Sequence, residues 1–346
     1  MLTYTLKVVE LKKETKDTVT ICFKQPALKK VSYLPGQYLT LIFRINGRRY
    51  IRPYSFSSAP GVDPCLEVTV KRIPGGIVSN HINDKVTEGD MVEVLKPMGD
   101  FVFDPAGTPP SKHIMLWGAG SGITPLISIA KYILHHNTGN RVTLAYGNRD
   151  FESVIFLNKI GEMLKEYPDM FKAVHFHTRL TVDAANPYLI QGRITEQKVL
   201  ALLEQTDNST GTIHYICGPT GLKESVRQAL AHVGVAPDDI HYEDFEIVRD
   251  PKDFEEVTTQ TISLIKDNKK HAVEVPKGKS ILESGLDALL ELSYSCQTGN
   301  CTVCKGTLRQ GAIKMIGVNK RPADLQDNEY LLCCSYPLGE NVEVEV

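Results

Sequence analysis

The chain has 346 residues, of which 42% are hydrophobic and 23% charged, and its formal net charge is -2. This length exceeds one ordinary core, so we expect three domains, and the near-neutral charge disfavours nucleic acid as a partner. No run approaches the roughly 18 apolar residues of a membrane span, and the N-terminus lacks the apolar core of a signal peptide. We therefore expect a cytoplasmic protein that does not bind a membrane.

The first hundred residues alternate short apolar runs with turn residues. These runs are 38–43, 66–70 and 91–94. Short strands at such spacing are typical of an antiparallel barrel or sandwich. A Pro- and Gly-rich stretch at 105–110 ends the region. We therefore predict an antiparallel β-barrel domain over residues 1–108.

From His113 onward, strand-like runs alternate with helical runs. The strand-like runs are 114–117, 142–146, 174–177 and 214–217, and the helical runs are 126–135 and 221–232. Repeated alternation of strand and helix predicts a parallel, doubly wound α/β sheet. We assign this domain to residues 109–246.

A charged stretch at 247–258 reads as a linker to a third, α+β domain over residues 259–346. This domain opens with a predicted hairpin, 260–265 and 271–275, and continues through a predicted helix, 280–290. Beyond the helix lies a cluster of cysteines. Tight clustering of cysteines in a cytosolic chain indicates metal or redox chemistry rather than a disulfide framework.

The clustered cysteines have the spacing Cys296-x4-Cys301-x2-Cys304, and a distant fourth cysteine is Cys333 or Cys334. Four thiolates at this spacing form the plant-type [2Fe–2S] pattern. The alternative is a zinc site, but zinc usually takes paired C-x2-C knuckles and the second knuckle is absent. The sequence therefore predicts a [2Fe–2S] cluster.

Spacing alone leaves both Cys333 and Cys334 open as the fourth ligand. The segment Cys333-Cys334-Ser335-Tyr336-Pro337 resembles the Cys-x-x-Tyr-Pro ending common in plant-type ferredoxins. We therefore choose Cys333. Cys334 is then expected to point to the opposite side of its strand as a packed thiol.

A glycine-rich segment at 117–125 follows a strand and opens a helix. Its Gly118, Gly120 and Gly122 would let backbone N–H groups approach a pyrophosphate at the positive end of the helix. A tight strand-to-helix turn is the alternative interpretation, because the motif departs from G-x-G-x-x-G. The segment 217–219 ends a later strand of the same sheet, where ligands bind in open α/β sheets; a buried structural cysteine is its alternative.

In the barrel, Arg52-Pro53-Tyr54-Ser55 combines a guanidinium, an aromatic face and a hydroxyl within four residues. These groups suit a diphosphate, a flat ring system and a ring nitrogen respectively. The segments 36–38, 70–72 and 76–79 flank the tetrapeptide on either side and strengthen this interpretation.

Together these motifs resemble the ferredoxin–NADP reductase superfamily. The order of flavin, nucleotide and C-terminal ferredoxin domains is similar to the reductase components of multicomponent oxygenases of the phenylacetyl-CoA epoxidase type. The resemblance covers essentially the whole chain, and it implies FAD as the flavin and a β-grasp fold for the third domain.

The resemblance also implies roles for individual residues. Arg52 would bind the flavin pyrophosphate, Tyr54 would pack on the isoalloxazine and Ser55 would lie near flavin N5. The further implied flavin contacts are Val70, Arg72, Gly76, Val78 and Ser79. The implied nucleotide contacts are Gly118, Gly120, Gly122, Thr124, Pro125, Cys217, Gly218 and Pro219. Phe245, in a Glu-x-Phe motif, would shield the nicotinamide face of the flavin, which makes Tyr54, Ser55, Cys217 and Phe245 the expected catalytic set.

Nicotinamide gives up two electrons as hydride whereas a [2Fe–2S] cluster accepts one, so a flavin is needed between them. Arg149 and Arg179 follow the second and third strands of the α/β sheet and would suit the 2′-phosphate of NADPH. NADH and a solvated loop position are the alternatives, and the adjacent Asp150 counts toward them.

The expected function is an NAD(P)H-dependent reductase serving a protein electron acceptor. We expect that acceptor to be a multicomponent oxygenase of the phenylacetyl-CoA epoxidase type. A ring-hydroxylating dioxygenase, a hydroxylase or a hybrid-cluster protein is the alternative partner. A redox-sensing binding protein is the alternative from a different functional class.

Overall fold

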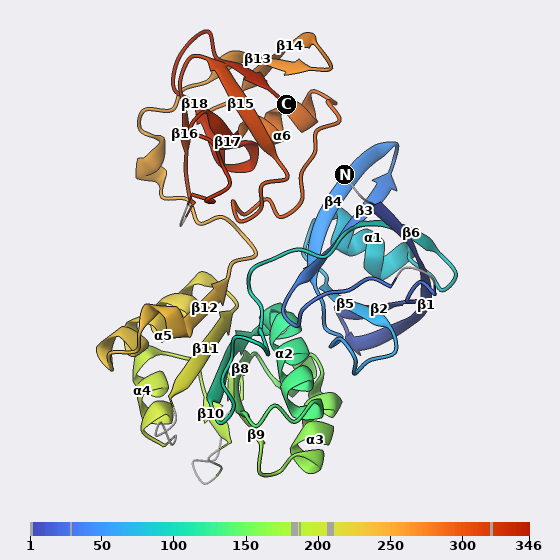
Figure 1. Ribbon diagram of the computed structural model, residues 1–346, viewed down its shortest axis with the longest axis vertical. Helices are drawn as coiled ribbons and strands as arrows, with labels where there is room; N and C mark the ends of the chain where they lie inside the picture. Colours follow the sequence, from blue (N-terminus) through green and yellow to red (C-terminus); the bar gives the residue numbers. More distant parts are fainter. Residues whose placement is uncertain (1–2, 28–29, 181–185, 187, 206–210, 319–320) are drawn as a thin grey trace. The chain divides into compact units, whose positions relative to one another are not determined.

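The computed structural model divides the chain into two compact units, Met1–Asp244 and Phe245–Val346. It describes residues 3–27, 30–180, 186, 188–205, 211–318 and 321–346. Within these residues the first unit holds two six-stranded sheets, and the second holds a five-stranded and a two-stranded sheet. Figure 1 shows the first unit in blue to yellow and the second in orange to red.

The first sheet of the first unit is an antiparallel barrel. Its strands, in the spatial order β4-β3-β6-β1-β2-β5, are β1 (Thr3–Thr15), β2 (Thr18–Phe23), β3 (Tyr38–Ile45), β4 (Arg48–Ser55), β5 (Leu66–Lys71) and β6 (Met91–Leu95). An antiparallel bridge between Phe56 and Val68 links the chain after β4 to β5, at the two ends of this order. The predicted antiparallel barrel is therefore confirmed.

Helix α1 (Ile77–Lys85) lies against the barrel and was not predicted from the sequence. It buries Val78, Ser79 and Ile82, and the two aliphatic side chains join the barrel core. The pattern is difficult to recognise in the sequence because the remaining side chains of this short helix are polar or exposed.

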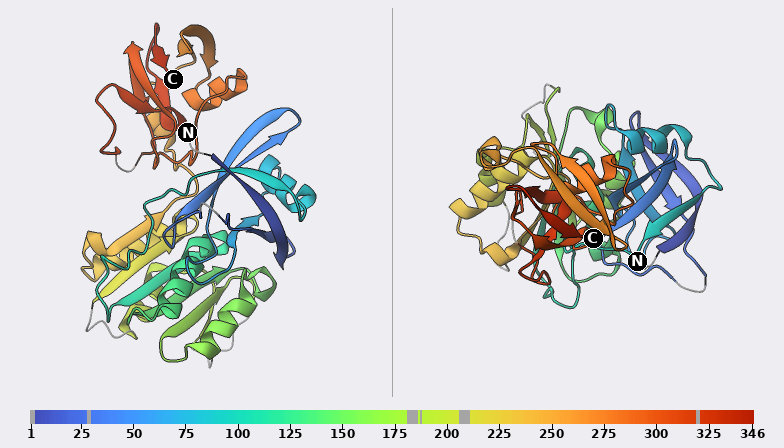
Figure 2. Two further views of the ribbon diagram at one scale, coloured as in Figure 1. Left: turned by 45° about the vertical axis from the view of Figure 1, so that its right-hand side comes forward. Right: turned by 90° about the horizontal axis from the view of Figure 1, so that it is seen from above.

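The second sheet of the first unit is parallel throughout. Its strands, in the order β10-β9-β8-β7-β11-β12, are β7 (His113–Ala119), β8 (Arg141–Asn148), β9 (Phe171–His177), β10 (Leu189–Gln191), β11 (Thr212–Cys217) and β12 (Ile240–Glu243). The helices are α2 (Ile123–His135), α3 (Leu157–Glu166), α4 (Glu196–Glu204) and α5 (Thr220–His232). Helices lie on both faces of the sheet, as Figure 2 shows, so the predicted doubly wound fold is confirmed.

The order of the parallel strands indicates at which edge of the sheet a ligand would bind. The chain runs outward from β7 to β8 and β9 on one side, and then returns to β11 and β12 on the other. Ligands of open α/β sheets bind at the carboxyl ends of the strands where the order reverses, here between β7 and β11. Six of the seven residues of β7 are buried, which is typical of a central parallel strand.

The second unit has the predicted α+β composition. Strands β13 (Gln260–Lys266) and β14 (Lys269–Val275) form the predicted hairpin, whose turn residues Asp267 and Asn268 both have positive φ, as a type I′ turn requires. The remaining strands are β15 (Lys305–Gln310), β16 (Ile313–Met315), β17 (Glu329–Leu331), β18 (Ser335–Pro337) and β19 (Glu343–Glu345). Strand β19 is parallel to β13, and β15 is antiparallel to both β19 and β17.

Helix α6 (Ile281–Asp287) is shorter than the predicted helix at 280–290. It begins at a capping box, in which Ser280 and Glu283 exchange side-chain to backbone hydrogen bonds. It ends early because Leu289 takes a left-handed φ of 62°, and the amide of Leu290 donates to the carbonyl of Gly285. Such a left-handed residue terminates a helix.

The segment predicted as a linker, 247–258, packs against the second unit. A Cβ on Gly317 would lie 2.2 Å from Cγ2 of Ile247, so the segment approaches the backbone of Gly317 closely. Val257 is buried with Ile316 and Tyr336 in a small core, and Phe254 packs on it. The apolar residues of this segment therefore hold it on the second unit, despite its charged composition.

Across the described part of the chain, no helix has the length and apolar character that crossing a membrane would require.

Candidate functional site

The glycine-rich loop joins β7 to α2 at the edge where the strand order reverses. A Cβ on Gly122 would lie 2.0 Å from the carbonyl oxygen of Cys217, and one on Gly118 would lie 2.8 Å from Cδ1 of Leu126. These two glycines are therefore required for packing between the loop, β11 and α2. A tight strand-to-helix turn, the alternative to a pyrophosphate loop, is therefore enough to explain Gly118 and Gly122.

Gly120 is different from its two neighbours. Its φ is +54°, and a Cβ there would meet no heavy atom within 4 Å, so the residue faces open space. The hydroxyl of Tyr146 donates to its carbonyl oxygen at 2.8 Å and holds the loop in place. This opening suits the close approach of a bound pyrophosphate.

The first turn of α2 carries the other two predicted nucleotide residues. The N-cap residue of α2, Gly122, makes no side-chain capping hydrogen bond. The Thr124 hydroxyl donates to the carbonyl of Ser121 at 3.0 Å, and Pro125 is buried in the same turn. No side chain caps this helix end, but the amide of Ile123 donates to the carbonyls of Gly120 and Ser121, and Pro125 has no amide to offer an anion.

Residues 217–219 lie beside this loop, at the end of β11. Cys217 is 1% exposed, and burial raises the pKa of its thiol, with the charges of Glu243 and Asp244 adding to the effect. A Cβ on Gly218 would lie 2.8 Å from Leu222, so this glycine is also closely packed, and Pro219 precedes α5. The structure thus brings the glycine-rich loop and residues 217–219 together.

The barrel motif meets the same edge through Ser55. The Ser55 hydroxyl is buried and donates to Oε2 of Glu243 at 3.3 Å. Glu243 ends β12 and lies in register with Cys217 of β11. The structure therefore brings Ser55, Cys217 and Glu243 together. Sequence reasoning did not select Glu243 as a site residue, although its position at the end of the last strand beside β11 was a usable signal.

Phe245 follows two residues after Glu243. It is 45% exposed and is the first residue of the second compact unit. Its role over the flavin stays a prediction.

Arg52 and Tyr54 lie on β4, opposite Leu41 and Leu39 of β3. The Arg52 guanidinium donates to the carbonyl of Ile51 at 2.7 Å, and burial raises the pKa of Tyr54. Because the two residues are separated by one position on a strand, their side chains share one face of the sheet.

The other predicted flavin contacts surround the start of α1. Gly76 is the N-cap residue of α1 and makes no side-chain capping bond, so the helix presents uncapped amides. A Cβ on Gly76 would lie 2.6 Å from Oγ of Ser79, and that oxygen accepts a hydrogen bond from the amide of Ile73 at 3.1 Å. Val78 is buried in the same helix, and Val70 is buried in β5. A side chain at position 76 would therefore collide with Ser79 and crowd Ile73, so this turn requires glycine.

Arg72 is already paired in this structure. Its guanidinium binds both carboxylate oxygens of Asp84, at 2.8 and 2.6 Å, and donates to Oδ1 of Asn80 at 2.8 Å. Arg72 would therefore contact a flavin phosphate only through N–H groups that Asp84 and Asn80 do not occupy, or after its ion pair with Asp84 has broken.

Arg149 and Arg179 come together at the carboxyl ends of β8 and β9. The amide of Arg179 donates to the carbonyl of Arg149 at 2.8 Å. Asp150 is engaged as a helix cap, because its carboxylate accepts from the amide of Ser153 at 3.0 Å. This bond to Ser153 lowers the pKa of Asp150, and the charge of Arg179 contributes.

The four predicted cluster ligands lie together in the second unit. Hydrogen bonding to Cys301 lowers the pKa of Cys296. Cys304 lies next to Cys333, which also has Cys334 as a neighbour. The amide of Thr298 points at Sγ of Cys296 at 3.4 Å, and Gly299 in the same loop takes a positive φ of 77°.

The donor set bears on which metal group this site could hold. All four predicted ligands are thiols; Cys296, Cys304 and Cys333 are buried and Cys301 is half-buried. Each iron of a [2Fe–2S] cluster takes two thiolates from the protein, so this set of four thiols fits the two-iron cluster.

Cys333 and Cys334 differ in their surroundings. Cys333 has both Cys304 and Cys334 as neighbours, and the Cys334 thiol donates to the carbonyl of Leu331 at 3.3 Å. The expectation that Cys334 lies on a strand is wrong, because Leu332–Cys334 is a single 3-10 turn between β17 and β18. Cys334 is nevertheless fully buried, as expected of a packed thiol.

Comparison with known proteins accounts for all three parts of the chain. Residues 5–103 match the oxidoreductase FAD-binding domain, residues 116–228 the oxidoreductase NAD-binding domain, and residues 264–338 the 2Fe-2S iron-sulfur cluster binding domain. The chain is 33% identical to the ferredoxin reductase component of 3-ketosteroid-9-alpha-monooxygenase from Mycolicibacterium smegmatis, over 98% of this chain and 96% of that protein. The chain belongs to the FAD-, NAD- and [2Fe–2S]-containing reductases of multicomponent oxygenases.

Other members of this reductase family agree with the assignment. The chain is 29% identical to a component of the 1,2-phenylacetyl-CoA epoxidase of Escherichia coli, over 99% of this chain and 97% of that protein. The solved structure of phthalate dioxygenase reductase matches with a TM-score of 0.66 and 25% identity, over 99% of this chain and 98% of that one. The predicted superfamily, the oxidoreductase class and the three cofactor domains are thereby confirmed.

Proposed function

We propose that this reductase takes hydride from NADPH onto FAD and delivers electrons through its [2Fe–2S] cluster to the oxygenase component of a multicomponent oxygenase. The observation that carries the proposal is the presence on one chain of the cysteine cluster Cys296-x4-Cys301-x2-Cys304 and of the site formed by Ser55, Cys217 and Glu243. When bound, FAD accepts electrons as a pair and releases them singly, which links the nucleotide to the cluster.

In this proposal the barrel residues hold the flavin. Arg52 neutralises the pyrophosphate, and the uncapped amides that follow Gly76 at the start of α1 add hydrogen bonds to it. Tyr54 packs on the isoalloxazine. Val70, Arg72, Val78 and Ser79 complete the wall of the flavin site.

The catalytic set comprises Tyr54, Ser55, Cys217 and Phe245, to which we add Glu243. The carboxylate of Glu243 accepts from the Ser55 hydroxyl and so fixes its orientation near flavin N5. The buried Cys217 stays a neutral thiol, since burial and the two neighbouring carboxylates raise its pKa. A neutral, closely packed group here excludes water from the face where the nicotinamide would stack.

The edge between β7 and β11 binds the nucleotide. Gly120 and the first turn of α2, with Gly122, Thr124 and Pro125, face the pyrophosphate. Gly118, Gly218 and Pro219 shape the same crevice. Arg149 and Arg179 bind the 2′-phosphate, which favours NADPH, and the use of Asp150 as a helix cap supports this choice over NADH.

We assign Cys296 and Cys301 to one iron and Cys304 and Cys333 to the other. The backbone amide of Thr298, which points at the Cys296 sulfur, would stabilise negative charge on the cluster.

For the partner we propose an oxygenase of the phenylacetyl-CoA epoxidase type, acting in the cytoplasm. The matching component of the Escherichia coli epoxidase covers nearly the whole chain at 29% identity. A 3-ketosteroid monooxygenase is the second candidate, because the reductase component of that system is 33% identical over a similar length.

The test is an anaerobic reduction assay with protein loaded with FAD, iron and sulfide. NADPH should bleach first the flavin absorbance and then the visible cluster absorbance, and addition of purified oxygenase component should restore the cluster signal. Product formation with the epoxidase or with the steroid oxygenase would distinguish the two partners. If neither NADPH nor NADH reduces the flavin, the proposal is wrong.

A further inference from the structure

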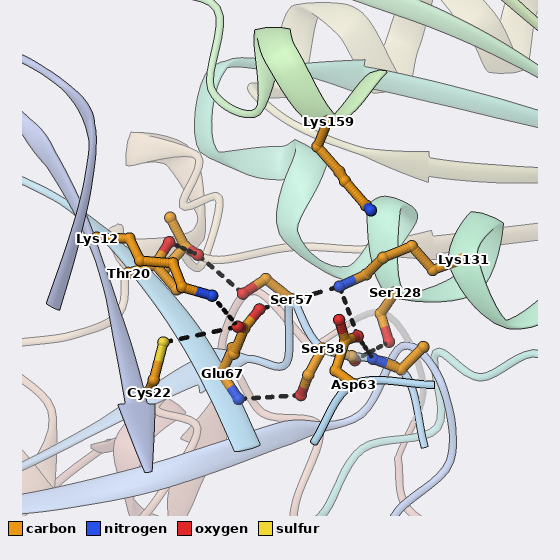
Figure 3. Close-up of polar contacts among 12 residues, drawn as sticks. Lys12, Thr20, Cys22, Ser57, Ser58, Asp63, Glu67, Ser128, Lys131 and Lys159 are labelled. Carbon is orange, nitrogen blue, oxygen red and sulfur yellow. Dashed lines mark hydrogen bonds and ion pairs between the residues drawn. The ribbon is translucent and has the colours of Figure 1, made fainter. Parts of the chain in front are cut away.

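A network of buried charged and polar side chains joins the barrel to helix α2, away from the cofactor motifs themselves. Figure 3 shows Lys131 of α2 reaching toward Asp63, with Glu67 of β5 and Lys12 of β1 beyond it. The Lys131 ammonium lies 2.7 Å from Oδ2 of Asp63 and 4.0 Å from Oε2 of Glu67. The side chains of Lys131, Asp63 and Glu67 are each less than a fifth exposed.

One turn before Lys131, Ser128 makes a second contact with the barrel. Its hydroxyl is fully buried and donates to the carbonyl oxygen of Ser58 at 2.6 Å. Further along the chain, just after α2, the ring of His136 hydrogen-bonds the carbonyl of Pro60 at 3.2 Å. Helix α2 and its C-cap thus contact the barrel segment 58–63 at three points.

The barrel side of this contact is itself rigid. The amides of Ser57 and Ser58 both donate to the carbonyl of Glu67, and the amide of Glu67 donates back to Oγ of Ser58 at 3.0 Å. The amide of Ala59 donates to Oδ2 of Asp63 at 2.7 Å, so the carboxylate that pairs with Lys131 also closes its own loop. A segment held by this many bonds has little freedom to shift.

Each side of the contact lies shortly after one of the two cofactor motifs in the sequence. Ser58 comes three residues after Ser55, the end of the flavin motif, and Ser128 comes one helical turn, ~6 Å, after Thr124 of the nucleotide loop. A displacement of α2 on the barrel would therefore carry the nucleotide loop with it. Hydride transfer requires reacting atoms roughly 3–3.5 Å apart, so such a displacement would alter the rate strongly.

We propose that Ser128 and Lys131 are positioning residues, which hold α2 and its glycine-rich loop in one register on the barrel and thereby set how the nicotinamide meets the flavin. This inference rests on the proposed function. Buried ion pairs often contribute little net stability, but they can favour one arrangement of two packed elements over others. Holding α2 in one position on the barrel requires such an effect.

The test compares Ser128→Ala and Lys131→Met with Lys159→Met. Lys159 is the matched control, since it is a nearby lysine on α3 whose pair with Glu162 is exposed. For each protein, FAD content, unfolding midpoint and the rate of anaerobic flavin reduction by NADPH are measured, the last with both protiated and C4-deuterated nucleotide. Binding of oxidised NADP is followed by the difference spectrum of the flavin, which reports stacking without turnover.

We expect the Ser128→Ala and Lys131→Met proteins to retain FAD and to bind NADP within about twofold of the parent protein. We also expect their flavin reduction to be slowed about tenfold, with a larger deuterium isotope effect and a smaller stacking signal. The Lys159→Met protein should match the parent. Should Lys131→Met fail to fold, Ser128→Ala alone decides, because it removes one hydroxyl without stranding a charge.

Two outcomes would overturn the inference in different ways. If the variants lose stability or FAD but reduce their remaining flavin at the parent rate and with the parent isotope effect, the contact is structural only. If the parent protein itself takes no hydride from either nucleotide, the proposed function fails and this inference fails with it.

Discussion

The hydroxyl of Ser55, the last residue of β4, donates a hydrogen bond to the carboxylate of Glu243, the last residue of β12. The two residues are 188 positions apart, and they join the flavin motif of the barrel to the edge of the nucleotide sheet. This bond orients the one hydroxyl expected near flavin N5, so it is the first contact to test.

Replacing Ser55 by Ala should slow flavin reduction by about 10²-fold, the effect of losing one well-placed hydrogen-bond donor at a reaction centre. FAD content should be unchanged, since in the proposed function Arg52 and the start of α1 make the phosphate contacts. Stopped-flow absorbance of the flavin after mixing with NADPH measures the rate. Ser263→Ala, on β13 of the second unit, is the control, and an equal rate in both variants would contradict the assigned role.

The identity of the fourth cluster ligand can be tested by replacing the sulfur atom with oxygen in each of two neighbouring cysteines. Cys333→Ser should lose the [2Fe–2S] cluster or shift its spectrum, because Cys333 is the predicted ligand and lies next to Cys304. Cys334→Ser should keep the parent spectrum, since the thiol of Cys334 donates to the Leu331 carbonyl and a hydroxyl can do the same. Iron and sulfide content and the electron paramagnetic resonance signal of the reduced protein measure the outcome, and the reverse result would make Cys334 the ligand.

Arg149 and Arg179 should determine the preference for NADPH. The double variant Arg149→Gln with Arg179→Gln should lower the affinity for NADPH about 10- to 100-fold, the value of one or two hydrogen bonds to a charged group. Affinity for NADH should change little, which makes NADH the control within the same protein. Binding titrations with both nucleotides measure the effect, and equal losses for the two would refute a 2′-phosphate site here.

Two glycines should respond to alanine with opposite signs. Gly122→Ala should destabilise the first unit by roughly 1–3 kcal/mol, because the new Cβ would lie 2.0 Å from the Cys217 carbonyl. Gly161→Ala, in the middle of α3 with no atom within 4 Å of the new Cβ, should stabilise it by about 0.5–1 kcal/mol. Urea unfolding monitored by the single tryptophan, Trp117, which is buried in β7, reports on this domain. Equal shifts would show that the loop can move away from β11.

Two histidines, the half-buried His175 and the buried His214, should make the nucleotide domain sensitive to acid. Burial lowers the pKa of His175 to about 4 and that of His214 to about 3, and the ring of His214 also accepts a hydrogen bond from Nε1 of Trp117 at 3.2 Å. The folded pKa values lie below the unfolded value near 6.5, so the unfolded chain binds more protons between them. Stability is therefore complete above pH 6.5 and falls as the pH drops, by about 2 kcal/mol for each histidine at pH 5.

Urea unfolding of the parent and of His175→Gln at pH 7.5 and pH 5 measures this effect. The variant should lose less stability between the two pH values than the parent. Carboxylates contribute equally to both proteins and cancel in the comparison. If the parent and the variant lose the same free energy of unfolding between the two pH values, His175 takes up its proton as readily in the folded protein as in the unfolded chain.

Several elements of the fold could be predicted from the sequence because their signals are local. The apolar runs of β3, β5 and β7 to β9, the hairpin β13–β14, and helices α2 and α5 all correspond to the expected segments. Helix α1 was missed, and α6 ends at Asp287 rather than at 290, because tertiary contacts and one left-handed residue decide those limits.

The chemistry of this protein could be predicted from its sequence, since the cysteine spacing, the glycine-rich loop and the Arg-x-Tyr-Ser motif are each defined over a few neighbouring residues. The contacts between distant parts of the chain could not: Ser55 with Glu243, Lys131 with Asp63, and Arg72 with Asp84. Such contacts depend on barrel closure and strand order. These place residues of remote sequence position side by side and leave no local pattern in the chain.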